Sequence, residues 1–232
     1  MNYTGNYKDC FNCKLRYSSV FCDIYSEDLQ QIEESKIRKI YTKGEEIFKT
    51  GYNSVGIYII EVGKVKLEIP TKKRTQIVRL AKAGEIIGYR SALFRNQHDT
   101  TAIALEKTEV CFINKELFQR LFRKSNGLSL QILQFMNSEI QRYEKNETHF
   151  LNKNVKERIA AVLLNLLTKF GVEPVDQTIN IQLSRGDLSS LCGTAIETLI
   201  RTLADLKSDG VIGLKGKRIR IIKPEVLNNI LQ

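Results

Sequence analysis

The sequence predicts an α+β protein, because three kinds of pattern follow one another along the chain. Short apolar or alternating runs separated by glycines fill the first half, as expected for β-strands. A long stretch then repeats apolar residues at three- and four-residue steps, which indicates a helix. The last third contains short helical segments around a glycine and a basic hairpin, which predicts a smaller, mostly helical domain.

Composition agrees with this division and excludes several protein classes. The chain has 232 residues, of which 42 % are hydrophobic and 27 % charged, a balance that excludes disordered and collagen-like chains. No apolar run reaches the roughly 18–20 residues that a membrane span needs. The first twenty residues carry charges and no apolar stretch, so we expect no secretory signal and a cytoplasmic protein without a membrane partner. The net charge of +10 favours a polyanionic partner such as nucleic acid.

The first half is predicted to form an all-β sandwich or barrel. Its strands are expected at residues 43–48, 56–61, 64–69, 76–80 and 110–114. Gly63 and Lys64 separate two alternating runs, so we expect a hairpin turn there.

The long helix carries one apolar stripe with a polar face opposite. The stripe consists of Leu128, Ile132, Phe135, Met136, Ile140 and Tyr143. Such a stripe either packs on its own β-domain or forms the seam of a dimer, and we favour a dimerisation helix. A second helix follows and is expected to end near Gly171, before a short strand at 179–183.

Residues 183–223 predict a helix-turn-helix followed by a basic wing. Ser184 precedes Asp187 by three residues, a spacing that caps a helix start. Gly193 interrupts the helical pattern, and a second helix begins near Ile196. Residues 211–222 then form two short runs around a basic tip, which predicts a hairpin.

The second helix of this motif is the candidate for reading DNA bases. Arginine can bridge the O6 and N7 atoms of guanine, glutamate can accept from N4 of cytosine, and an apolar side chain can contact a thymine methyl. The first turns of the helix carry the predicted base readers Ile196, Glu197, Ile200 and Arg201. Contacts to the DNA backbone are predicted for Ser184, Arg185, Thr194, Lys215, Lys217 and Arg218. The alternative is an ordinary ion pair between Glu197 and Arg201 on a solvated helix face.

Several segments resemble the Crp/Fnr family of transcription regulators. They are LSRGD at 183–187, GTAIETLIR at 193–201 and GVIGLKGKRIR at 210–220, with KGEEIFKTG at 43–51 and GEIIG at 84–88 upstream. The resemblance implies a jelly-roll (double-stranded β-helix) effector-sensing domain at 1–124, a dimerisation helix at 125–151 and a winged helix-turn-helix at 152–232. It also implies a homodimer on a pseudo-palindromic operator, with RNA polymerase as a further partner of an activator.

Two positions depart from the family pattern on the reading helix. Ala195 stands where many members have Ser or Thr, so we expect the cap to fall to Thr194 or to no side chain. Ile200 replaces a common Ser or Gly that faces the DNA.

The effector is not decided by the sequence. Members that bind cyclic AMP carry a Gly-Glu and an Arg-Ser pair. This chain has Tyr89 after Gly88 and no arginine in residues 97–102, and its Arg90-Ser91 pair lies on the wrong side of the loop, so we do not expect cyclic AMP. Four cysteines can supply thiolates for a [4Fe–4S] cluster, namely Cys10, Cys13, Cys22 and Cys111. Cys111 resembles the remote ligand of the family's oxygen-sensing branch, but Ser19 stands where that branch has its third ligand. Another metal or redox response, or thiols that bind nothing, remain open.

These observations together predict a sequence-specific DNA-binding transcription regulator. A cyclic-nucleotide-binding module that regulates a partner protein and an iron–sulfur redox protein are the alternatives. The sequence shows neither a phosphate-binding loop nor a Ser/His/Asp arrangement, so we do not expect an enzyme.

Overall fold

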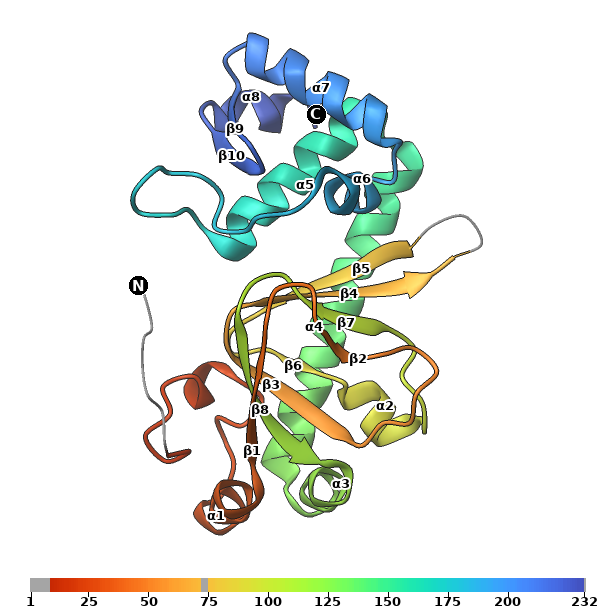
Figure 1. The fold of residues 1–232 in the computed structure, drawn as a ribbon. Coiled ribbons are helices and arrows are strands. Elements are labelled where there is room, and N and C mark those ends of the chain that lie inside the picture. The colour runs from red at the N-terminus through yellow and green to blue at the C-terminus, as the bar shows by residue number, and fades with distance from the viewer. Residues whose placement is uncertain (1–8, 72–74, 232) are drawn as a thin grey trace. The chain divides into compact units, whose positions relative to one another are not determined.

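The computed structural model describes residues 9–71 and 75–231 and confirms the α+β class (Figure 1). The chain divides into two compact units, one of Met1–Lys73 with Val78–Gln141 and one of Arg74–Ile77 with Arg142–Gln232. No described helix is long and apolar enough to span a membrane.

The first unit is built on two four-stranded sheets, as a β-roll. One sheet has the order β1 (Ile37–Tyr41), β8 (Thr108–Asn114), β3 (Gly56–Val62) and β6 (Ile86–Ile87), and the other has the order β2 (Glu46–Phe48), β7 (Thr101–Ala104), β4 (Lys64–Pro70) and β5 (Thr75–Lys82). Both sheets contribute side chains to one core, which includes Tyr58, Ile60, Leu67 and Ala102. The predicted jelly-roll architecture is therefore confirmed.

The turn at Gly63 differs from the prediction. β3 ends at Val62 and β4 starts at Lys64, but the two strands belong to different sheets, so they form no hairpin. Gly63 has φ of 98°, and a Cβ atom on it would lie 2.5 Å from Thr108 Oγ1. The glycine therefore makes a corner between sheets that another residue would crowd. The alternating pattern predicted both strands but could not identify their partners, because register and pairing depend on distant strands.

A second core lies on the other face of the β1-β8-β3-β6 sheet. Ile57 and Ile59 point to this core, while Tyr58 and Ile60 point to the first, as expected for alternating side chains. The helices that cover it are α1 (Ser26–Ser35), α3 (Lys115–Lys124) and the first turns of α4 (Asn126–Asn152), while α2 (Tyr89–Phe94) adds Tyr89 and Ala92. An N-terminal segment with the short helix η1 (Arg16–Ser18) adds Val20 and Phe21.

The second unit contains a helix-turn-helix and a two-stranded wing. Its elements are α5 (Val155–Phe170), α6 (Arg185–Cys192), α7 (Ile196–Ser208), β9 (Ile212–Lys215), β10 (Arg218–Ile221) and α8 (Pro224–Asn229). α5 ends at Phe170, and Gly171 follows with φ of 68°, as predicted. The strand predicted at 179–183 is wrong, since these described residues form only a single bridge between Val172 and Ile179.

Candidate DNA-binding site and cysteine pocket

The turn between α6 and α7 has the geometry that the sequence predicts. Ser184 Oγ accepts a hydrogen bond from Asp187 N at 2.9 Å, and Ser184 N donates to Asp187 Oδ2 at 3.2 Å. α6 ends at Gly193, whose φ of 58° and ψ of 39° lie in the left-handed region that favours glycine. Ala195 precedes α7 without a side-chain cap. The reciprocal cap and the glycine turn thus set where α7 begins.

One face of α7 is buried and the other is open. Leu199, Leu203 and Leu206 are at most 1 % exposed and fix the helix in the second unit. Ile196 and Ile200 are 43 % and 50 % exposed, and Glu197 and Arg201 are exposed beside them. Within the described residues, neither Glu197 nor Arg201 forms an ion pair or a hydrogen bond through its side chain. The alternative of an ion pair between them is therefore not observed.

The wing is attached to the start of α6. β9 and β10 pair antiparallel with Lys215 opposite Arg218, and Gly216 makes the turn with φ of 60°. Arg185 Nη2 donates to Gly216 O at 3.0 Å, so the first residue of α6 holds the wing tip. Lys215 and Lys217 are exposed at this tip.

Arg218 of β10 pairs with Asp176, which lies in the segment between α5 and α6. Its Nη1 atom lies 2.6 Å from Asp176 Oδ2. Asp176 Oδ1 also accepts from Thr178 N at 3.1 Å and from Thr178 Oγ1 at 2.6 Å. The bonds from Thr178 and then Arg218 lower the pKa of the Asp176 carboxyl from 3.8 to about 2.

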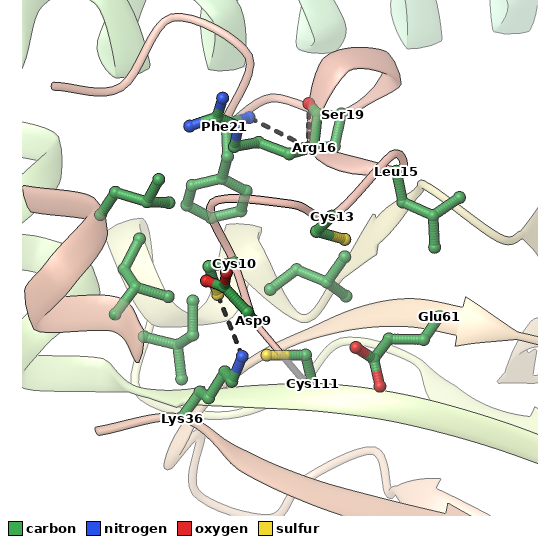
Figure 2. Close-up of a pocket in the computed structure, with 14 residues that line it drawn as sticks. Asp9, Cys10, Cys13, Leu15, Arg16, Ser19, Phe21, Lys36, Glu61 and Cys111 are labelled. Atoms are coloured by element: carbon green, nitrogen blue, oxygen red, sulfur yellow. Dashed lines mark hydrogen bonds between the residues drawn. The ribbon is translucent and has the colours of Figure 1, made fainter. Parts of the chain in front are cut away.

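Three of the five cysteines line one cavity of about 50 Å³ in the first unit (Figure 2). The lining consists of Asp9, Cys10, Cys13, Leu15, Arg16, Ser19, Phe21, Leu29, Ile32, Lys36, Ile59, Glu61, Cys111 and Ile113. We call this site the cysteine pocket. The N-terminal segment contributes Cys10 and Cys13, and β8 contributes Cys111. Two segments far apart in sequence thus bring thiols to one space.

Cys10 is held by a charged pair at the edge of the cysteine pocket. Lys36 Nζ donates to Cys10 Sγ at 3.3 Å and lies 2.6 Å from Glu33 Oε2. The same carboxylate oxygen accepts from Cys10 N at 2.6 Å. Burial raises the pKa of the Cys10 thiol to about 11 and that of Cys111 to about 12. Both thiols are therefore neutral at neutral pH in this arrangement.

Comparison with known proteins agrees with both units. The chain matches the cyclic nucleotide-binding domain family over residues 38–125 and the Crp-like helix-turn-helix domain family over residues 157–230. It is 30 % identical over 218 residues to the fumarate and nitrate reduction regulatory protein of Vibrio cholerae, covering 92 % of this chain and 86 % of that protein. The chain belongs to the Crp/Fnr family of transcription regulators.

Other members of the Crp/Fnr family are similar in sequence or in fold. Electron transport regulator A of Shewanella oneidensis is 29 % identical, over 94 % of this chain and 88 % of that protein. The structure of FixK2 from Bradyrhizobium japonicum has a TM-score of 0.74 at 21 % identity, covering 84 % of this chain and 96 % of FixK2. A Crp/Fnr regulator from Eubacterium rectale also has a TM-score of 0.74, at 15 % identity, covering 91 % and 97 % of the two chains. The predicted family, fold class and DNA-binding regulatory function are confirmed.

Some residues predicted to contact the DNA backbone also make contacts within this Crp/Fnr chain. The Ser184 hydroxyl caps α6, and Thr194 is buried at 8 % exposure. Arg185 and Arg218 hold the wing through Gly216 and Asp176. Local bonds compete for these groups, which sequence spacing alone could not show.

The apolar stripe predicted on the long helix is divided between two surroundings. Leu128 and Ile132 are fully buried in the second core of the β-roll, so the prediction that they lie in a dimer seam is wrong. Phe135 and Met136 pack partly on the same core, whereas Ile140 and Tyr143 are 52 % and 38 % exposed. Two residues outside the predicted stripe, Leu130 and Leu133, are 55 % and 56 % exposed. Apolar residues lie on more than one face of this helix, so their spacing did not show which face meets its own domain.

The residues predicted for a [4Fe–4S] cluster are not assembled as a set. Such a cluster needs four thiolates, but Cys22 does not line the cysteine pocket and Ser19 does. In the part of the chain that the structure describes, no three His, Cys, Asp or Glu side chains are grouped to hold a metal ion. The arrangement therefore does not fit a four-cysteine cluster.

The positions compared with cyclic-AMP-binding members also have other contacts. Tyr89 is 5 % exposed and meets the ring of Phe135 edge-on, with 5.5 Å between ring centres. Asp99 pairs with Arg95 at 3.3 Å, and Thr101 Oγ1 accepts from Thr50 N at 3.1 Å. Tyr89 is thus part of the packing of α4 on the β-roll.

Proposed function

We propose that this Crp/Fnr regulator is a homodimer that recognises a pseudo-palindromic operator in double-stranded DNA through α7. The observation that carries the proposal is the exposed face of α7, where Glu197 and Arg201 lie one turn apart without an internal partner in the described chain. Ile196 and Ile200 flank them with exposed apolar surface. This face offers a guanine contact, a cytosine contact and two thymine-methyl contacts, each good bidentate pair supplying about 1–3 kcal/mol of discrimination.

The wing is proposed to bind the phosphate backbone. Lys215 and Lys217 are exposed at a tip that Arg185 holds against α6. A lysine that neutralises a phosphate releases bound counterions, so its contribution depends on salt and not on base sequence. Of the six residues predicted to contact the backbone, these two have the surroundings that suit the role best.

The dimer is proposed to form along α4. Leu130, Leu133 and Ile140 are each more than half exposed on this helix, and water-exposed apolar side chains on one helix are typical of an interface. Two copies of α7 would then enter successive major grooves about one helical turn apart. RNA polymerase is a further proposed partner if the protein activates transcription. The sensor, dimerisation and DNA-binding regions are proposed at 1–124, 125–151 and 152–232.

The experiment that tests DNA reading is a selection of binding sites from random-sequence DNA with the full chain. Wild type should enrich one half-site containing a G·C pair, Arg201→Ala should lose the preference for that guanine, and Glu197→Ala should lose a preference for cytosine. Lys207→Ala, an exposed residue in the last turn of the same helix, should keep both preferences. Wild type that enriches no sequence would show that specific reading is wrong.

The effector site is proposed to be the cysteine pocket, with a thiophilic group as effector. Native interiors are close-packed, so a cavity of about 50 Å³ beside three thiols offers space and soft ligands together. Protein purified without oxygen should be analysed for metals, sulfide and visible absorbance. Cys10→Ser, Cys13→Ser and Cys111→Ser should each change the result, whereas Cys22→Ser should not. Equal results for all four variants and wild type would show that the cysteine pocket is not the effector site.

A further inference from the structure

A buried arginine lies in the middle of β5 of the β-roll. Arg79 is 6 % exposed. Its Nη2 atom donates to Glu85 Oε2 at 2.8 Å, and its Nη1 atom donates to Ile86 O at 3.2 Å. A planar guanidinium held by two hydrogen bonds has a fixed orientation. The β-roll therefore presents one positive charge in a defined direction.

The same guanidinium faces helix α4. Its Nε atom lies 2.8 Å from Glu139 Oε2, and its Cζ atom lies 5.1 Å from the centre of the Phe135 ring. Glu139 is 9 % exposed. The contact with Glu139 is an ion pair without the alignment of a hydrogen bond. The β-roll thus binds Arg79 firmly, and α4 is attracted to it by charge and by a cation–π contact.

The contact lies at an informative position along α4. Apolar packing of this helix on the second core involves Leu128, Ile132, Phe135 and Met136. Glu139 comes one turn after Phe135, and the boundary between the two compact units follows Gln141. The neighbouring Ile140 is 52 % exposed. Arg79 therefore acts where the packing of α4 on the second core ends, next to the exposed Ile140.

We propose that Arg79 is a positioning residue that determines how residues 135–140 of α4 lie on the β-roll, and thereby how the exposed face of α4 meets a second copy of this chain. The inference rests on the proposed dimer. Glu85 and Ile86 O hold the guanidinium on the β-roll, and its contact with Glu139 attracts α4. The β-roll is then coupled to the dimer face through one side chain.

The test compares two matched variants of the full chain. Glu139→Gln and Glu85→Gln each remove one carboxylate charge from Arg79 while keeping side-chain size, but only Glu139 lies on α4. The dimer dissociation constant is measured by sedimentation, and hydrogen exchange is measured for amides of residues 133–141. Glu139→Gln should change the dissociation constant about 2–30-fold and speed exchange in this segment. Glu85→Gln should change the dissociation constant less than about twofold.

The role of Arg79 and the dimer can fail separately. Equal effects of the two variants on dimerisation, or faster exchange spread over the whole β-roll in Glu139→Gln, would mean that Arg79 is structural only, and the proposal is then wrong. A wild-type chain that stays monomeric contradicts the proposed dimer instead. In that case the exchange measurement alone decides whether Arg79 positions α4. If exchange of residues 133–141 is unchanged in Glu139→Gln, the role of Arg79 is rejected.

Discussion

The open face of α7 and the buried contact between β5 and α4 both contain carboxylate and guanidinium groups, but only the buried groups are paired. Glu197 and Arg201 lie one turn apart in water with no internal partner in the described chain. Arg79 lies within 2.8 Å of both Glu85 and Glu139 in the β-roll. Exposed charges cost little when unpaired, whereas buried charges must be compensated. Pairing therefore separates charges that hold the fold from charges that remain available to a ligand.

The largest effect on stability should follow from removing Arg79 from its ion pairs with Glu85 and Glu139. Arg79→Met removes the buried guanidinium that Glu85 and Glu139 contact, and removing one partner of a buried ion pair costs about 3–5 kcal/mol of unfolding free energy. Urea denaturation of the full chain measures the loss. Arg90→Met removes an exposed arginine on α2 and should change the unfolding free energy by less than about 0.5 kcal/mol. Equal losses in both variants would show that the buried ion pairs of Arg79 stabilise the fold no more than an exposed arginine does.

The charges on the exposed face of α7 should affect DNA binding more than stability. Arg201→Ala should change the unfolding free energy by less than about 0.5 kcal/mol, because its side chain is exposed and has no internal partner in the described chain. Affinity for the selected operator should fall about 5–150-fold, which corresponds to about 1–3 kcal/mol. Fluorescence anisotropy with the selected site measures the affinity. A stability loss as large as that of Arg79→Met would show that Arg201 supports the fold.

A smaller effect is expected at the wing. Lys217→Ala should weaken binding to selected and unrelated DNA equally, and the slope of log affinity against log salt should fall by about 0.9. The measurement is a salt titration of both DNA sequences. Lys43→Ala, an exposed lysine of the β-roll, serves as the control and should leave the slope unchanged. A loss restricted to the selected site would assign Lys217 to base reading.

The smallest effect concerns the exposed pair between Asp176 and Arg218. The folded state lowers the pKa of Asp176 from 3.8 to about 2, so it favours the ionised carboxyl relative to the unfolded chain. The stability from this group is present above about pH 4 and is lost as the pH falls towards about 2. Asp176→Asn should therefore lower the unfolding free energy at pH 6, and the difference from wild type should shrink at pH 3. A difference that does not depend on pH would contradict the titration of this group.

Local features of this chain could be predicted because neighbouring residues determine them. Ser184 and Asp187 are three residues apart, so their reciprocal cap depends only on the first turn of α6. Gly193 and Gly171 adopt left-handed or related positive-φ conformations at helix ends, as their residue type favours. The inward leucines and the outward Glu197 and Arg201 follow from helical periodicity.

Contacts between distant segments could not be predicted in this way. The turn at Gly63 passes from one sheet to the other because β3 pairs with β8 and β4 with β7. Leu128 and Ile132 are buried because the second core of the β-roll covers them, although their spacing also suits a dimer seam. Arg185 and Arg218 are occupied by Gly216 and Asp176, far along the chain.

The amino-acid sequence alone therefore determined the order of the two domains, the helix-turn-helix and the residues on its open face, since these depend on spacing within a few residues. The tertiary structure decided that Cys10, Cys13 and Cys111 share one cavity without Cys22, and that Arg79 joins Glu85 to Glu139. The physical reason is that burial and ion pairing depend on which distant segments pack together, and local periodicity contains no information about that choice.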